Sequence, residues 1–134
     1  MFRTIIPIII LILISFYTFK VKSDQNKFLE KVSSGQISSK YDKELFAGTW
    51  HSSRAKVNID IKSDGGWVMG KTSGKWALQD EYFVWIYTDE DDIKVHSLVY
   101  EKLDKNHIVS VSENQFVLKE IDGSNTTFSR KKHN

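Results

Sequence analysis

The carboxylates of the acidic run from Asp89 to Asp92 are the residues in this sequence with the clearest potential for metal chemistry. Hard cations such as calcium bind several oxygen ligands at once, and a run of acids supplies such oxygens. The run lacks the glycine and the spaced ligands of a known calcium-binding loop. We therefore interpret it as the solvated tip of a hairpin.

A zinc site would draw on His51, His96 and His107. None of these histidines lies at a tight ligand spacing from another, and the chain contains no cysteine to complete a ligand set. His51 and His107 are placed by the pattern at strand edges, where exposure is the simpler interpretation. The sequence predicts no metal and no other cofactor.

Catalytic patterns are not found in the sequence. It has no Gly-x-Ser-x-Gly elbow to present a nucleophile. No pair of carboxylates stands out as a general acid and base. The prediction is that the protein is not an enzyme.

The best candidates for a binding site are aromatic. Aromatic side chains line many pockets for apolar ligands. They also carry much of the buried area in a small core, so the alternative is that they simply fill the interior. The candidate ligand-binding residues are Trp67, Trp76, Phe83, Trp85, Tyr87 and Phe116.

Alternation of apolar and polar residues after Leu45 predicts the elements that position these aromatics. Such alternation is typical of strands buried on one face, and tight turns between them indicate an antiparallel meander. Closing the meander into a small barrel removes its edges. Strands are predicted over Phe46–Ser52, Ala55–Ile61, Trp67–Lys71, Lys75–Gln79, Tyr82–Tyr87, Ile93–Glu101, His107–Ser112, Gln115–Glu120 and Asn125–Arg130. The fold class is thus an all-β, up-and-down barrel of eight or nine short strands, preceded by an N-terminal hydrophobic helix. Turns are predicted at Thr72–Gly74 and Asp104–Asn106.

The strand Tyr82–Tyr87 is the most apolar of the set. If Phe83 and the residues two and four places on point inward, then Tyr82, Val84 and Ile86 point outward. Such a row is an exposed apolar stripe unless another element covers it, and it would suit a protein partner or a membrane-proximal surface.

A glycine stands two places before a tryptophan in Gly48-Thr49-Trp50 and again in Gly74-Lys75-Trp76. Glycine in a strand allows close approach of another group. A tryptophan two places later points to the same face, so we expect each indole to plug the space that its glycine leaves. This structural interpretation is favoured over a ligand role.

Several short motifs together resemble the lipocalin-like small barrels, particularly short bacterial exported domains. They are Leu45, Gly48, Trp50, Asp64-Gly65, Gly74-x-Trp76, Phe116 to Glu120, Asp122-Gly123 and Thr127 to Arg130. The resemblance implies that a late basic residue lies over the first-strand tryptophan and closes one end of the barrel, which would pair Arg130 with Trp50. The domain is shorter than a full lipocalin, and Thr88-Asp89 is only a faint echo of that family's second conserved segment.

The N-terminal region, residues 1–23, has a basic start and a long apolar run. This form is typical of a secretory signal, but residues 2–19 also just reach the length of a membrane anchor, so both alternatives stay open. Residues 24–44 are polar and suit a linker with a short helix over Gln25–Val32. Residues 45–130 form the barrel and 131–134 a tail. Either alternative places the barrel outside the cytoplasm, in the periplasm or on the extracytoplasmic face.

Charge excludes one class of partner. The chain carries a formal net charge of +2, but residues 24–134 hold 16 basic and 17 acidic residues, a net charge of −1. A nucleic-acid-binding face needs a basic surface, so no nucleic acid is expected. The leading hypothesis is a non-enzymatic envelope module that binds a small apolar ligand or lipid. The alternative is a protein-interaction module, such as an inhibitor or immunity protein directed at a secreted hydrolase.

Overall fold

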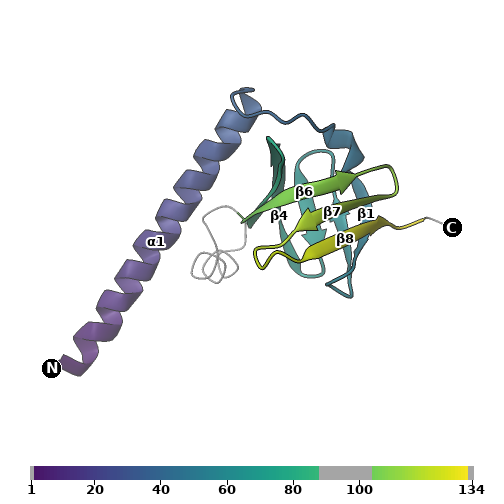
Figure 1. Cartoon of the computed structure of the whole chain (residues 1–134). Coiled ribbons are helices and arrows are strands. Elements are labelled where there is room, and N and C mark those ends of the chain that lie inside the picture. Colours follow the sequence, from purple (N-terminus) through teal and green to yellow (C-terminus); the bar gives the residue numbers. More distant parts are fainter. Residues whose placement is uncertain (1, 88–103, 133–134) are drawn as a thin grey trace.

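A closed antiparallel barrel forms the body of the protein (Figure 1). The computed structural model describes residues 2–87 and 104–132. Each strand pairs with the next along the chain, and the last pairs with the first. The strands are β1 (Gly48–Ser52), β2 (Asn58–Ile61), β3 (Gly66–Met69), β4 (Thr72–Gln79), β5 (Tyr82–Tyr87), β6 (Asp104–Val111), β7 (Gln115–Lys119) and β8 (Asn125–Arg130). The predicted all-β, up-and-down barrel is confirmed, with eight strands among the described residues.

Two predicted turns lie inside strands. Gly74 lies inside β4, where its Cα pairs with that of Trp67, and the preceding turn is made at Gly70, whose φ is +60°. Asn106 lies inside β6 and not in a turn, because its buried side chain bonds to the barrel interior. The predicted strand over Ile93–Glu101 lies outside the described residues.

The start of β2 is also later than predicted. The Ser52 hydroxyl accepts hydrogen bonds from the backbone N–H groups of Arg54 and Ala55, at 3.2 and 3.3 Å. These bonds fold the chain into a local turn after β1 and leave Val57 exposed. The alternating pattern therefore extended three residues beyond the strand that it described.

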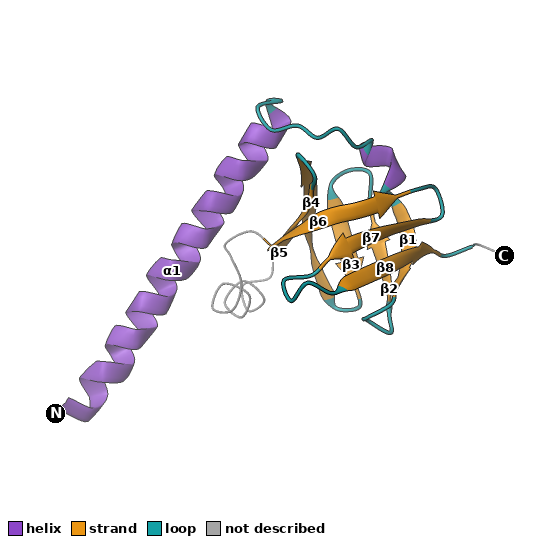
Figure 2. Ribbon diagram, viewed as in Figure 1, coloured by secondary structure: helices purple, strands orange, loops and turns teal. Residues whose placement is uncertain are grey.

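Helix α1 (Phe2–Ser33) stands beside the barrel and is joined to it by a loop and a short 3-10 helix, η1 (Lys43–Leu45) (Figure 2). No helix among the residues that the structure describes has a stretch long and apolar enough to cross a membrane. Whether residues 1–23 are cut or kept stays a prediction.

The last turns of α1 cover the outer face of the barrel. Phe28 packs with Ala77 of β4 and with Val84 and Ile86 of β5, and Leu29, Val32 and Ile37 join this cluster. Val84 and Ile86 are only 0% and 1% exposed. The outward apolar row is thus covered by the chain itself, although Tyr82 at its end remains 40% exposed.

The segment after α1 is fastened to the turn between β4 and β5. The backbone N–H of Asp80 donates to the carbonyl of Ser38 at 2.8 Å, and the Ser39 hydroxyl donates to the carbonyl of Asp80 at 2.6 Å. Lys40 and Glu81 form an exposed ion pair at 2.8 Å. Residues 38–40 therefore contact the β4–β5 turn directly.

A candidate ligand site at the open end of the barrel

The two ends of the barrel differ in how they are filled. We call the end with the β2–β3, β4–β5 and β6–β7 turns the closed end, and the end with the β1–β2, β3–β4 and β7–β8 turns the open end. At the closed end Phe46, which precedes β1, is fully buried against Trp76, Phe83 and Phe116. Trp76 and Phe83 stack with 4° between their planes, and this end holds a solid aromatic core.

Three of the six candidate ligand residues belong to that core. Trp76, Phe83 and Phe116 are buried among other aromatic rings, and none of them lines the pocket described below. Trp67, Trp85 and Tyr87 do line it. The structure therefore brings together half of the candidate set at one cavity and places the other half in packing.

Arg130 closes the solid end over Trp50. The centre of its guanidinium lies 4.2 Å from the centroid of the Trp50 ring, and the Cα atoms of the two residues are partners across β1 and β8. Its Nε donates to the carbonyl of Glu113 at 2.6 Å, and Nη1 and Nη2 donate to Ala47 and Leu45 at 3.0 and 3.3 Å. This is the pair that the resemblance implies.

The space beside each strand glycine is filled by a side chain other than the one expected. A Cβ on Gly48 would overlap the guanidinium of Arg130, while the Trp50 indole nitrogen stays 3.8 Å away. A Cβ on Gly74 would overlap the carbonyl of Ile86 and come within 2.8 Å of the indole of Trp67. The expectation fails at Gly74, where the nearby indole is that of Trp67. At Gly48 the Trp50 indole is in contact, but Arg130 lies closer.

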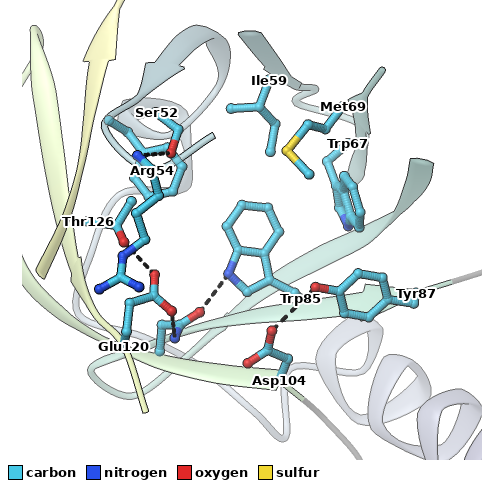
Figure 3. Close-up of a pocket in the computed structure, with 12 residues that line it drawn as sticks. Ser52, Arg54, Ile59, Trp67, Met69, Trp85, Tyr87, Asp104, Glu120 and Thr126 are labelled. Atoms are coloured by element: carbon cyan, nitrogen blue, oxygen red, sulfur yellow. Dashed lines mark hydrogen bonds between the residues drawn. The ribbon is translucent and has the colours of Figure 1, made fainter. Parts of the chain in front are cut away.

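The open end contains a cavity of about 160 Å³ (Figure 3). Figure 3 shows Ile59, Met69 and Trp67 on one side of it, Thr126 and Glu120 on the other, and Trp85 between them. The lining residues come from β1, β2, β3, β5, β6 and β8 and from the β1–β2 and β7–β8 turns. They are Ser52, Arg54, Ile59, Trp67, Met69, Trp85, Tyr87, Asp104, Asn106, Glu120, Thr126 and Phe128.

The aromatic wall of the cavity is made of rings at right angles. Trp67 and Trp85 lie 5.5 Å apart with 90° between their planes, and Trp67 and Tyr87 lie 5.4 Å apart at 86°. Edge-to-face packing of this kind is favoured by the ring quadrupoles and holds the rings in position. The wall is therefore preformed.

The polar wall is a chain of hydrogen bonds. The Asn106 side-chain oxygen accepts from the indole N–H of Trp85 at 2.8 Å, and its amide nitrogen donates to the Lys119 carbonyl at 3.2 Å and to Glu120 Oε2 at 3.5 Å. The Thr126 hydroxyl donates to Glu120 Oε1 at 2.6 Å. Nearby, the Tyr87 hydroxyl donates to Asp104 Oδ2 at 3.3 Å. Buried polar groups are thus satisfied and fixed in orientation.

Sequence reasoning missed the polar wall. The sequence pattern predicts a turn at Asn106, and it places Glu120 and Thr126 only in the strands of the last hairpin. Side chains two places apart in a strand point to the same face, and this repeat was the available signal. Asn106 stands two places before the inward Ile108, and Thr126 stands two places before the inward Phe128. A polar residue at an inward position of a strand needs buried partners and so marks the barrel interior.

Other candidates from the sequence form no site among the described residues. His51 is exposed, and His107 lies 3.3 Å from Glu81 at the surface near the closed end. The part of the chain that the structure describes has no cluster of three or more metal-ligating side chains. His96 and the acidic run from Asp89 to Asp92 lie outside the described residues.

A second hollow, of about 460 Å³, lies between the end of α1 and the outer face of β3 and β4. It is lined by backbone at Gly65, Gly66 and Gly74 and by Lys43 and Lys75. These lysines are exposed, and no buried polar group points to a ligand there. The open-end cavity is the better candidate site because its polar groups are buried and ordered.

Comparison with protein-family models, with curated proteins and with solved structures gives no match for this chain.

Proposed function

We propose that this protein is a non-enzymatic, lipocalin-like binding module of the cell envelope that holds a small ligand in the open end of its barrel. The observation that carries the proposal is the cavity lined by Trp67, Trp85 and Tyr87. Concave, mostly apolar sites with a few well-placed polar groups are the usual form of small-molecule sites. The ordered polar wall gives such a ligand a defined orientation.

The size of the cavity limits the ligand. At about 160 Å³ it is close to the roughly 150 Å³ cavity that accommodates benzene, and it is well below the roughly 300 Å³ at which drug-sized sites begin. The closed end offers no continuation, because Phe46, Phe83 and Phe116 fill it. We therefore favour a ring-sized or short-chain ligand over a lipid with its full acyl chain buried.

Export of the protein is part of the proposal. Apolar side chains of α1 are exposed, and Phe16 and Phe19 are 69% and 74% exposed. A segment of this kind is stable in water only if it is removed or covered. Export through a cleaved signal, or retention at the extracytoplasmic face of the membrane, supplies either outcome. Mass spectrometry of the mature chain from its host distinguishes these two outcomes.

The test of ligand binding uses the full-length protein in a non-ionic detergent. Intrinsic tryptophan fluorescence is titrated with a panel of small neutral compounds such as benzyl alcohol and hexanol. A saturable change is expected, because Trp67 and Trp85 line the cavity. Met69→Phe, which adds volume to the cavity lining, should weaken binding about tenfold or more. Val68→Phe adds the same kind of side chain at the next position, outside the lining, and should leave binding unchanged.

A second candidate function is a protein-interaction module. Ile121, in the β7–β8 turn, is 74% exposed, and Val57, in the β1–β2 turn, is 48% exposed. An ion contact between Arg54 and Asp122 at 3.7 Å links these two turns at the open end. Capture of a secreted hydrolase that is lost in Ile121→Ser, together with no response to any small compound, would favour this candidate.

A further inference from the structure

We propose that the open-end cavity selects a small organic cation, a protonated or quaternary ammonium group on an apolar body. The inference rests on the proposed function, since it names the chemical class of ligand for the same cavity. It follows from the hydrogen bonds that the indole N–H groups of the aromatic wall already make and from the acceptor capacity of Glu120 in the polar wall.

The aromatic wall presents ring surfaces and not donors. The indole N–H of Trp85 donates to Asn106, and the indole N–H of Trp67 donates to the carbonyl of Lys75 at 2.9 Å. The hydroxyl hydrogen of Tyr87 is directed to Asp104. The faces of these rings carry the negative part of the ring quadrupole, which attracts cations and repels anions.

Perpendicular rings are well suited to a compact cation. With planes at 90° and 86°, the rings of Trp67, Trp85 and Tyr87 bound the cavity from more than one direction. A tetrahedral ammonium group meets several ring surfaces in such a corner, whereas a flat neutral ligand stacks on only one of them. Trimethylammonium is also comparable in size to the ring that a cavity of this volume accommodates.

The polar wall is rich in acceptors. An ionised carboxylate offers about four lone-pair positions, and Glu120 receives two hydrogen bonds from the protein, from Thr126 and Asn106. Glu120 therefore keeps the capacity to accept from the N–H of a protonated amine, and its negative charge also attracts a quaternary ammonium group that has no N–H.

Arg54 is the positively charged side chain among the described lining residues. It lies at the rim, where it does not repel a cation bound inside the cavity. Its side chain is 47% exposed, and its guanidinium reaches Asp122 at 3.7 Å. Arg54 and Asp122 form a neutral pair at the rim, while Glu120 lies deeper beside the buried Thr126.

The test compares choline with 3,3-dimethyl-1-butanol, its neutral isostere, by calorimetry and tryptophan fluorescence on the full-length protein in a non-ionic detergent. The two ligands have nearly the same shape and differ in the charge at one atom. We expect choline to bind about tenfold tighter or more, the size of effect that one or two cation–π contacts and a carboxylate provide.

Glu120→Gln is the matched variant, because the amide oxygen still accepts from Thr126 and the fold is preserved. It should lower choline affinity about tenfold and lower the affinity for the neutral isostere by much less, because the neutral ligand loses no charge–charge attraction. Glu113→Gln removes the same charge from the exposed β6–β7 turn at the closed end and should change neither affinity.

Three outcomes separate the proposals. Preference for choline that depends on Glu120 supports the cation site. Equal or tighter binding of the neutral isostere overturns the cation inference while the ligand-binding function stands. No saturable response to either probe or to the neutral panel overturns both.

Discussion

The side-chain oxygen of Asn106 in β6 accepts a 2.8 Å hydrogen bond from the indole N–H of Trp85 in β5. Both residues are nearly buried, with 5% and 8% of their surface exposed. The bond joins the aromatic wall of the cavity to its polar wall. It fixes the indole plane of Trp85, and through the Asn106 amide it also holds Glu120 in place. The two walls therefore act as one preformed unit.

Asn106→Leu removes this link and should lower the free energy of unfolding by about 1–3 kcal/mol. The reason is that the buried N–H of Trp85 and the Lys119 carbonyl both lose a partner. Urea unfolding followed by fluorescence measures the loss. Asn58→Leu, at an exposed position of β2, is the control and should stay within about 0.5 kcal/mol of the unaltered protein. Equal stability of the two variants would contradict the prediction.

Arg130→Lys should destabilise the barrel by about 2 kcal/mol, and Arg130→Ala by about 3 kcal/mol. Lysine keeps the charge over Trp50 but lacks the planar fork that bonds to the carbonyls of Leu45, Ala47 and Glu113. Chemical denaturation of both variants tests the order. Lys131→Ala, at the exposed neighbouring position, is the control and is expected to have little effect on stability. A loss of stability similar to that of Arg130→Ala would mean that positive charge, and not the hydrogen bonds of Arg130, stabilises this end.

Gly74→Ala should cost about 3 kcal/mol or prevent folding. The added methyl group meets the backbone carbonyl of Ile86 and the indole of Trp67, neither of which can move without opening the barrel. Gly35→Ala gives the comparison, since Gly35 has φ +77° and open space around it, so that only backbone strain of about 1 kcal/mol applies. Thermal unfolding of both proteins checks the ranking, and the reverse order would refute it.

Phe28→Ala should release the end of α1 from the barrel. The substitution removes the ring that covers Ala77, Val84 and Ile86, at a cost of about 3 kcal/mol. Hydrogen exchange is expected to become faster in residues 25–37, while protection in β7 and β8 persists. Glu30→Ala, on the exposed side of the same helix, serves as the control. Unchanged exchange in residues 25–37 would show that the helix end is held in another way.

Acid should loosen the segment at Lys40. The hydrogen bond from Lys40, followed by that from His107, lowers the pKa of Glu81 below its ordinary value of 4.5. A carboxyl whose pKa is lowered in the folded state stabilises it above the ordinary pKa, and that contribution is lost as the pH falls through the lowered value. Stability should therefore decline below about pH 4.5. In Glu81→Gln this part of the acid dependence is expected to vanish. An identical pH profile in the variant would rule out the contact as its source.

Local patterns in the sequence determined much of the barrel. The alternation in Tyr82–Tyr87 separates Phe83, Trp85 and Tyr87, which belong to the interior cluster, from Val84 and Ile86, which face outward. Side chains alternate between faces every residue, so a single strand carries this information by itself. The turn glycine at Gly123 and the strand Asn125–Arg130 are equally local, and the sequence located both.

Only the tertiary structure decided which aromatic rings fill the barrel and which border a cavity. Trp76 and Trp85 both point inward and are Cα partners in adjacent strands, yet Trp76 stacks on Phe83 at the closed end and Trp85 faces the cavity. That difference depends on how the register closes β8 onto β1 and on where Phe46 enters. The packing of α1 over Val84 and Ile86 was likewise decided only by the tertiary structure. Such contacts join residues far apart in the chain, and their geometry is set by packing of the whole barrel, for which a single strand carries no signal.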